Sequence, residues 1–162
     1  MHESFAVPEG SKPVVYAALA RHAEALFEGV HDKIANSANL AALLYHGLPN
    51  VSWSGFYFLR RKQLIVGPFQ GKPACVSVAL GRGVCGQAAE LRRTLVVADV
   101  ASFPDHIYCD PDARSEIVVP LERDGKLLGV LDLDAPVPDR FDEDDRRGLE
   151  KIAAIWLHSF NR

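Results

Sequence analysis

Two of the three cysteines lie in segments rich in turn-forming or polar residues, where a thiol is accessible to other molecules. Cys75 ends the run Gly67-Pro-Phe-Gln-Gly-Lys-Pro-Ala-Cys75, and Cys109 lies within Pro104-Asp-His-Ile-Tyr-Cys-Asp-Pro-Asp-Ala-Arg-Ser115. The polar neighbours of Cys109 predict an exposed side chain. A positive charge on His106 or Arg114 can lower the pKa of its thiol, whereas the nearby acids oppose this effect. In a reducing compartment, two such loop cysteines favour a redox couple over a permanent bridge.

A second set of residues capable of chemistry is acidic. Asp132 and Asp134 alternate with leucines in Gly129-Val-Leu-Asp-Leu-Asp134, so a strand here points both carboxylates to one face. Glu116 begins the preceding expected strand, and a hairpin would bring it close to them. The simpler interpretation is a solvated sheet face. Alternatively, three acids held together raise at least one pKa and can keep a proton near neutrality or hold an ammonium group.

Two further patterns suggest chemistries that the spacing or the local sequence disfavours. Gly81-Arg-Gly-Val-Cys-Gly86 matches the G-x-G-x-x-G of dinucleotide sites. Only about eight residues remain for a helix before the next expected strand, whereas a parallel crossover needs a dozen or more, so we interpret a turn that opens a short helix. A Cys-His hydrolase is chemically open, but the local sequences typical of its cysteine are missing. Most other histidines are better explained as solvated or capping groups: His22, His31, His46 and His158.

Composition excludes several classes of protein. There is no C-x-x-C pair for structural zinc, and three cysteines cannot all pair within one chain. Eighteen Lys and Arg against 21 Asp and Glu give a formal charge of -3, with no basic stripe for nucleic acid. No apolar stretch approaches membrane-spanning length, and the N-terminus does not have the pattern of a secretion signal. We therefore expect a cytoplasmic protein with no nucleic-acid or membrane partner.

The elements that must position these residues follow from periodicity and turn signals. A length of 162 residues predicts one domain, with residues 1–10 as a loose lead. A first helix is expected to begin after Ser11, which can cap it, and a second to end near Gly47. Further helices are expected at 84–91 and at 142–160, the last of which has an acidic first turn. Strands are expected at 51–59, 63–66, 76–80, 94–98, 116–121 and 126–134.

Two segments are expected to be irregular: residues 67–75, which are rich in Gly and Pro, and residues 99–115. The Asp124-Gly125 pair predicts a hairpin turn between the last two strands. Consecutive hairpins imply a mainly antiparallel central sheet, with the helices packed mostly on one face. The expected fold class is therefore α+β.

Four segments, in this order, closely resemble the free methionine-(R)-sulfoxide reductases, which are single-domain GAF enzymes. The segments are Gly67-Pro-Phe-Gln-Gly-Lys-Pro-Ala-Cys75, Phe103-Pro-Asp-His-Ile-Tyr-Cys-Asp110, Ser115-Glu-Ile-Val-Val-Pro120 and Gly129-Val-Leu-Asp-Leu-Asp134. The resemblance runs from about Lys33 to Ile155 and implies a single GAF-like catalytic domain over residues 1–162. The alternative is a non-catalytic GAF sensor domain that binds a cyclic nucleotide or another small ligand, since such domains share the architecture without both cysteine loops.

The resemblance implies a role for each thiol. Cys109 would attack the sulfur of free L-methionine-(R)-sulfoxide, release methionine and become a sulfenic acid, with which Cys75 would form an intramolecular disulfide. The resemblance also implies that thioredoxin is the external reductant and that the reaction belongs to the response to oxidative stress. It implies a homodimer that binds no cofactor or metal. Cys85 matches an auxiliary thiol. The chain departs from the family at Tyr108, where a small residue is common, and this change can alter access to the nucleophile.

The same resemblance assigns acidic and aromatic residues to the substrate. Glu116 and Asp134 are expected at the sulfoxide end, where a carboxyl group delivers a proton to the departing oxygen, and Asp132 at the ammonium group. Trp53 and Tyr57 match aromatic residues that enclose the methyl-sulfur end. Their spacing puts both on one face of a strand, which suits core packing equally well.

Overall fold

The computed structural model describes residues 5–161. Its six strands form one antiparallel sheet in the order β3-β2-β1-β6-β5-β4. The strands are β1 (Trp53–Arg60), β2 (Gln63–Gln70), β3 (Ser77–Ala79), β4 (Leu95–Val97), β5 (Ser115–Arg123) and β6 (Lys126–Ala135). The long strands β5 and β6 are joined at Asp124-Gly125, where both residues have positive φ, as expected for a tight hairpin turn.

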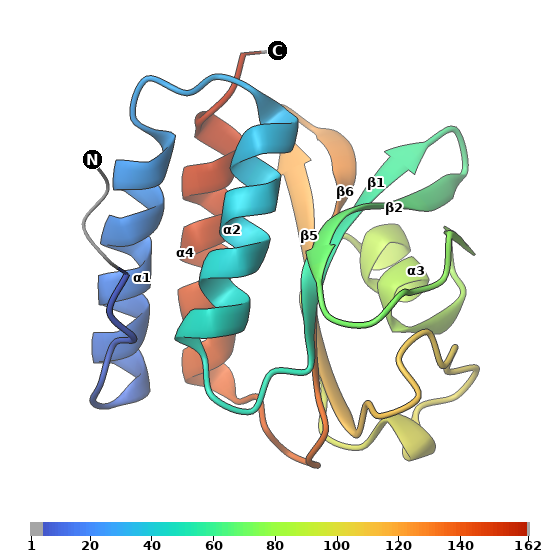
Figure 1. Ribbon diagram of the computed structural model, residues 1–162. Coiled ribbons are helices and arrows are strands. Elements are labelled where there is room, and N and C mark those ends of the chain that lie inside the picture. The colour runs from blue at the N-terminus through green and yellow to red at the C-terminus, as the bar shows by residue number, and fades with distance from the viewer. Residues whose placement is uncertain (1–4, 162) are drawn as a thin grey trace.

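Helices of unequal length cover the two faces of this sheet (Figure 1). On one face lie α2 (Lys33–Gly47) and α4 (Glu143–His158), with α1 (Lys12–Phe27) packed against both. On the other face lie the short α3 (Gly83–Leu91) and the irregular segment around the 3-10 turn η1 (Val100–Ser102). The expected α+β class, with an antiparallel sheet and helices mostly on one face, is confirmed.

Two expectations for the start of the chain have mixed outcomes. Of the expected lead, residues 5–9 have no regular secondary structure, and residues 1–4 lie outside the described residues. Ser11 does occupy the position before α1, but its side chain accepts no capping hydrogen bond there, so the expected cap is wrong in that respect.

None of the helices in the described part of the chain is both long and apolar enough to cross a bilayer.

Strand β2 continues into the segment expected to be a loop. Phe69 and Gln70 of β2 pair with β1. The register between the two strands shifts between Gly55 and Tyr57 of β1, and Gly67 and Pro68 of β2 lie opposite this irregularity. Strand β3 pairs only with residues 63–65 of β2, so this edge of β2 is unpaired at Pro68. Proline has no backbone N–H, and at this position its absence removes no hydrogen bond to β3. The loop boundary expected at residue 67 is therefore wrong, and the irregular segment begins after Gln70.

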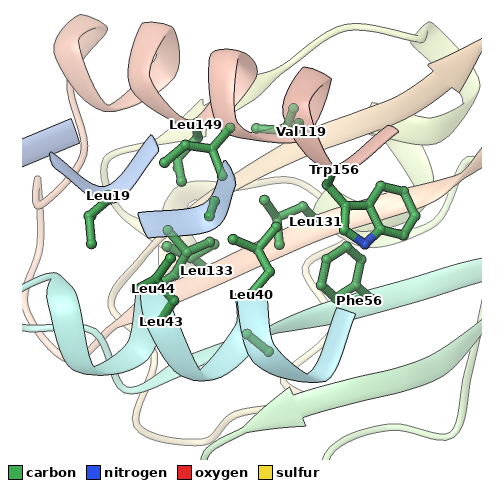
Figure 2. Close-up of a cluster of buried hydrophobic side chains, with 14 of the residues drawn as sticks. Leu19, Leu40, Leu43, Leu44, Phe56, Val119, Leu131, Leu133, Leu149 and Trp156 are labelled. Atoms are coloured by element: carbon green, nitrogen blue, oxygen red, sulfur yellow. The ribbon is translucent and has the colours of Figure 1, made fainter. Parts of the chain in front are cut away.

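The larger core lies between the sheet and the long helices. Alternation along β6 sends Leu131 and Leu133 into this layer, where they meet Leu40 and Leu44 of α2 (Figure 2). Trp156 of α4 packs its ring against Phe56, with centroids 4.9 Å apart. The same alternation sends the intervening residues of β6 to the opposite face, beneath α3. The core on the helix side therefore determines which residues β6 presents on the other side.

Candidate active site

The two loop cysteines are joined in a disulfide. Cys75 lies between β2 and β3, Cys109 lies between η1 and β5, and their Cα atoms are 5.0 Å apart across 34 residues of sequence. Cys109 is only partly exposed, so the expectation of an exposed thiol is wrong for this oxidised state. Cys85 is free and buried in α3. The two cysteines that the sequence places in separate loops are thus brought together by the fold.

Strand β6 brings the three acids together. Its register pairs Asp134 directly with Glu116 on β5, and Asp132 is two residues along on the same face. All three side chains are buried, with 5–6% of each residue exposed, because α3 and the loop after η1 cover this face. The interpretation of a solvated sheet face is therefore wrong. The expectation that Glu116 lies beside the aspartates is met by the register.

Burial controls the protonation of this cluster. Desolvation raises the pKa of Glu116, Asp132 and Asp134 well above ordinary carboxyl values, and the neighbouring carboxylates raise each pKa further. Burial also raises the pKa of the Cys85 thiol, with Asp132 adding to the effect. The cluster therefore holds its protons to higher pH than ordinary carboxyl groups do, which favours a role in donating a proton.

A histidine from the cysteine loop contacts the acid cluster. His106 Nε2 lies 3.3 Å from Glu116 Oε2, and both side chains are almost fully buried. Desolvation lowers the pKa of His106, so the imidazole favours its neutral form. The sequence interpretation considered His106 only as a cation beside Cys109. The signal that was available is its position three residues before that cysteine, in the same loop.

The loop that carries Cys109 is tied down at several further points. Asp110 is buried and accepts a hydrogen bond from Ser52 Oγ at 2.9 Å. At the exposed rim, Arg82 pairs with Asp105, and Lys72 pairs with Asp112. The last pair links the loop of Cys109 to the loop of Cys75. Sequence analysis treated Asp110 only as a polar neighbour, because nothing local shows that its side chain turns inward.

The two expected aromatic residues stack on the face that carries the acids. The rings of Trp53 and Tyr57 are 5.7 Å apart, and Trp53 also stacks on Phe69 at 5.2 Å. Gly55 between them makes this possible, because a Cβ there would lie 2.3 Å from the Phe69 Cβ. Tyr57 lines the cavity described below, whereas Trp53 lies behind it and donates its indole N–H to Lys72 O at 3.1 Å.

These groups surround one small enclosed cavity of about 20 Å³, enough for about one water molecule. Its lining residues are Tyr57, Val78, Gly83, Val84, Cys85, His106, Ile107, Cys109, Asp110, Ala113, Glu116, Asp132 and Asp134. A larger hollow of about 680 Å³ lies between α1 and α4 on the other side of the sheet, and no thiol lines it. We assign the functional site to the small cavity, because Cys109 of the disulfide and the acid cluster line it together, whereas none of these residues lines the larger hollow.

The glycine-rich motif serves packing in this structure. Gly83 begins α3, as expected for a turn that opens a short helix. A Cβ on Gly86 would lie 2.3 Å from the carbonyl oxygen of Ala79, so only glycine permits this close approach of α3 to the chain after β3. The turn brings Cys85 to the acid cluster, with its Sγ 3.8 Å from Glu116 Oε1.

Comparison with known proteins relates this arrangement to characterised ones. The GAF domain family matches residues 22–155. Protein YtsP of Bacillus subtilis (strain 168) is 51% identical over 146 residues, which cover 89% of this chain and 90% of that protein. Free methionine-R-sulfoxide reductase of Escherichia coli (strain K12) is 44% identical over 144 residues, or 89% and 87% of the two chains.

A solved structure extends the comparison to three dimensions. The free methionine-R-sulfoxide reductase of Neisseria meningitidis, solved in complex with its substrate, superposes with a TM-score of 0.93 at 40% identity. The match covers 97% of this chain and 95% of that one, so the similarity extends over the sheet, the helices and both cysteine loops.

Proposed function

The chain belongs to the GAF domain family and, within it, to the free methionine-R-sulfoxide reductases, oxidoreductases that act on a free amino acid, and we propose the following reaction for it. Free L-methionine-(R)-sulfoxide is reduced to methionine by a thiol pair that thioredoxin restores. The observation that carries the proposal is that Cys109, which is bonded to Cys75, lines one cavity together with three buried carboxyl groups.

The thiols perform the reduction in balanced steps. The Cys109 thiolate attacks the sulfoxide sulfur and forms an S–S bond to it. The protonated oxygen then moves to Cys109 Sγ as the S–S bond and the original S–O bond break, so methionine leaves and Cys109 becomes a sulfenic acid. The Cys75 thiol then attacks Cys109 Sγ and expels the oxygen as water, which gives the disulfide. Thioredoxin reduces that disulfide by thiol–disulfide exchange. Cys85 stays outside this exchange, since it remains free when the other two cysteines are paired.

The acids provide the proton and hold the substrate. Glu116 and Asp134 face each other across β5 and β6, so either carboxyl group can protonate the sulfoxide oxygen as the S–O bond breaks. Asp132, two residues further along, accepts the substrate ammonium. Tyr57, with Trp53 behind it, provides the apolar wall for the methyl-sulfur end. Enclosure of the ammonium end would exclude peptide-bound methionine, because a continuing chain has no exit.

The oxidised cavity is too small for the substrate. About 20 Å³ accommodates a water molecule and not an amino acid, so the loop that carries Cys109 must move outward after thioredoxin breaks the disulfide. Among the described residues, that loop is also held by the exposed pairs to Arg82 and Lys72, by the hydrogen bonds of Asp110 and His106, and at its end by the Arg114 amide, which donates to Ala135 O at 2.7 Å. Exposed ion pairs contribute little stability, so the two pairs at the rim oppose opening only weakly.

The alternative of a cyclic-nucleotide sensor fits the charges poorly. A cyclic nucleotide brings a phosphate anion, whereas the cavity presents Glu116, Asp132, Asp134 and Asp110. Among the described residues that line it, His106 is the only candidate cation, and burial favours its neutral form. A calorimetric titration with cyclic nucleotides tests this alternative, and tight binding would support it.

The deciding experiment is a coupled assay with thioredoxin, thioredoxin reductase and NADPH. Free L-methionine-(R)-sulfoxide should support NADPH oxidation, whereas the free S epimer and N-acetylated R substrate should not. Turnover of the S epimer or of the blocked substrate, or none with the free R epimer, would overturn the proposal. Gel filtration with light scattering tests the homodimer that the resemblance implies.

Two cysteine variants separate the proposed thiol roles. Cys109→Ser should abolish methionine release, since no thiolate remains to attack sulfur. Cys75→Ser should release about one methionine per chain and then stop, because the sulfenic acid has no thiol with which to form a disulfide. Quenched-flow measurement of methionine resolves the two. Undiminished steady-state turnover of Cys75→Ser would reject its role as the resolving thiol.

A further inference from the structure

The free thiol of α3 and two of the acids form a compact set of potential metal ligands. Cys85 Sγ, one oxygen of Glu116 and one oxygen of Asp132 all lie within 4.8 Å of one another. The sulfur is already 3.8 Å from Glu116 Oε1. The proposed reaction uses the two carboxyl groups but gives the thiol no task, and a neutral thiol contributes little to binding an ammonium group. The sulfur therefore needs a separate explanation.

A second observation indicates that this set is incomplete without a ligand. Asp132 is 95% buried, since only 5% of its surface is exposed, and its Oδ1 atom has no hydrogen-bond partner among the described residues. A buried carboxylate oxygen that lacks a partner is costly, and such oxygens are normally paired or bound to a cation. Asp132 lines the cavity together with Cys85 and Glu116, so the missing partner belongs in that space.

We propose that the oxidised protein, with Cys75 and Cys109 joined, binds one thiophilic divalent cation of the Zn²⁺ type through Cys85, Glu116 and Asp132. The size of the cavity is consistent with this: about 20 Å³ holds a single ion or water molecule and excludes an amino acid. The proposal concerns the oxidised form alone. It therefore goes beyond the reductase reaction and does not depend on it.

The geometry requires only small movements. Zinc binds sulfur at about 2.3 Å and carboxylate oxygen at about 2.0 Å, which in a tetrahedron places the two ligand atoms about 3.5 Å apart. The observed separation of 3.8 Å between Cys85 Sγ and Glu116 Oε1 is close to that value. No two ligand atoms of the set are more than 4.8 Å apart, so the longest separation must shorten by at most about 1.5 Å. The cavity holds the ion without an added water molecule, so the second oxygen of one of the two carboxylates supplies the fourth ligand, and the Cys85 thiol releases its proton on binding.

His106 supports the set from outside. Its Nε2 lies 3.3 Å from Glu116 Oε2, the oxygen that does not face Cys85, and so holds this carboxylate in place. Such outer contacts fix the orientation of a ligating group. One thiolate and two carboxylates favour a borderline-soft cation that accepts four ligands, whereas Mg²⁺ and Ca²⁺ prefer six or more oxygen ligands.

Cobalt titration of the oxidised protein tests the site, since Co²⁺ reports its ligands by absorption. We expect one Co²⁺ per chain, a thiolate-to-cobalt charge-transfer band, and displacement by equimolar Zn²⁺ but not by a large excess of Mg²⁺. With Cys75 and Cys109 in the disulfide, Cys85 is the sole free thiol of the chain that can give the band. Absence of the band from the oxidised wild type would overturn the proposal.

Two variants of the proposed ligands, one in α3 and one in β5, are compared with a control variant in β5. Cys85→Ser should lose the band, and Glu116→Gln should weaken Co²⁺ binding at least tenfold. Glu122→Gln, a change on the same strand at an exposed residue paired with Arg92, should bind as the wild type does. Retention of the band by Cys85→Ser would overturn the proposal.

A measurement on the wild type guards against variants that fail to fold. X-ray absorption of the zinc-loaded oxidised protein should show one sulfur at about 2.3 Å and otherwise oxygen or nitrogen ligands. An all-oxygen shell, or two sulfurs, would contradict the assignment. The test needs no turnover, so the two proposals can fail separately. A protein that binds cobalt but does not reduce methionine sulfoxide would support this site and reject the proposed function. A protein that reduces methionine sulfoxide but binds no cobalt would reject this site and support the proposed function.

Discussion

At the scale of single residues, the site places three carboxyl groups in an environment that disfavours their charge. Glu116, Asp132 and Asp134 are each at least 94% buried, and no lysine or arginine is among the described residues that line their cavity. Isolated buried carboxylates are costly, so the folded protein holds protons that the unfolded chain releases. The property that makes a carboxyl group a proton donor at neutral pH therefore costs stability as the pH rises.

Glu116→Gln should reduce the pH dependence of stability. A raised pKa in the folded state contributes stability that is present below the unfolded pKa of about 4 and is lost as the pH rises toward the folded value. His106, whose pKa is lowered, makes the free energy of unfolding rise with pH instead. The contribution of Glu116 is therefore measured as the difference in pH dependence between the wild type and Glu116→Gln. Urea unfolding from pH 4 to pH 8 should show a smaller decline for Glu116→Gln than for wild type. Glu122→Gln is the exposed control, and equal slopes in all three proteins would contradict the expectation.

At the scale of secondary structure, β6 organises the site, and α4 is anchored by a buried acid on the opposite face. Asp145 is fully buried in the first turn of α4 and accepts hydrogen bonds from four donors. The donors are Lys12 Nζ at 2.6 Å, Tyr16 Oη at 2.7 Å, the Asp142 amide at 2.8 Å and Arg140 Nη1 at 3.1 Å. This network joins α1 to the start of α4. From the sequence, only the acidic first turn was predicted.

Asp145→Ala should lower the free energy of unfolding by about 3–5 kcal/mol, because it leaves buried donors without their acceptor. Asp144→Ala is a matched control in the same acidic turn and should cost no more than about 1 kcal/mol through the helix dipole. Urea unfolding monitored by tryptophan fluorescence measures both, since Trp156 lies in α4. Similar losses for the two variants would show that the Asp145 network does not stabilise the junction of α1 and α4.

At the scale of the whole molecule, one covalent bond joins two loops that are far apart in sequence at the site. The disulfide connects two loops on the α3 face of the sheet, 34 residues apart in sequence, and closes the cavity. Such a bond restricts mainly the unfolded chain, so it stabilises the oxidised fold. Reduction should therefore loosen the protein at the same step that admits the substrate.

Reduction should destabilise the wild type by up to about 4 kcal/mol, the chain-entropy value for a loop of this length. Thermal unfolding with and without a thiol reductant measures the difference as a lower Tm for the reduced protein. Cys75→Ser provides the control, since it has no disulfide to lose and its Tm should not respond to the reductant. A wild-type Tm that is indifferent to reductant would contradict the coupling.

Local pattern determined a large part of this protein. Periodicity and turn signals predicted the helices, most strand boundaries and the Asp124-Gly125 hairpin, because these depend on neighbours in sequence. Alternation along β6 placed Asp132 and Asp134 on one face, and resemblance to a family supplied roles that no spacing could. The boundary at residue 67 was missed, because a register shift and a free sheet edge allow Gly67 and Pro68 in a strand.

Only the tertiary structure decided which distant residues meet. Whether the face of Asp132 is wet or buried depends on α3 and the cysteine loop folding over it, which no period in β6 records. His106 meets Glu116, and Cys85 joins the same carboxyl groups, through strand register and helix placement across the sheet. Sequence reports contacts that repeat along the chain, whereas proton retention, cavity size and ligand sets arise from contacts between segments far apart in it.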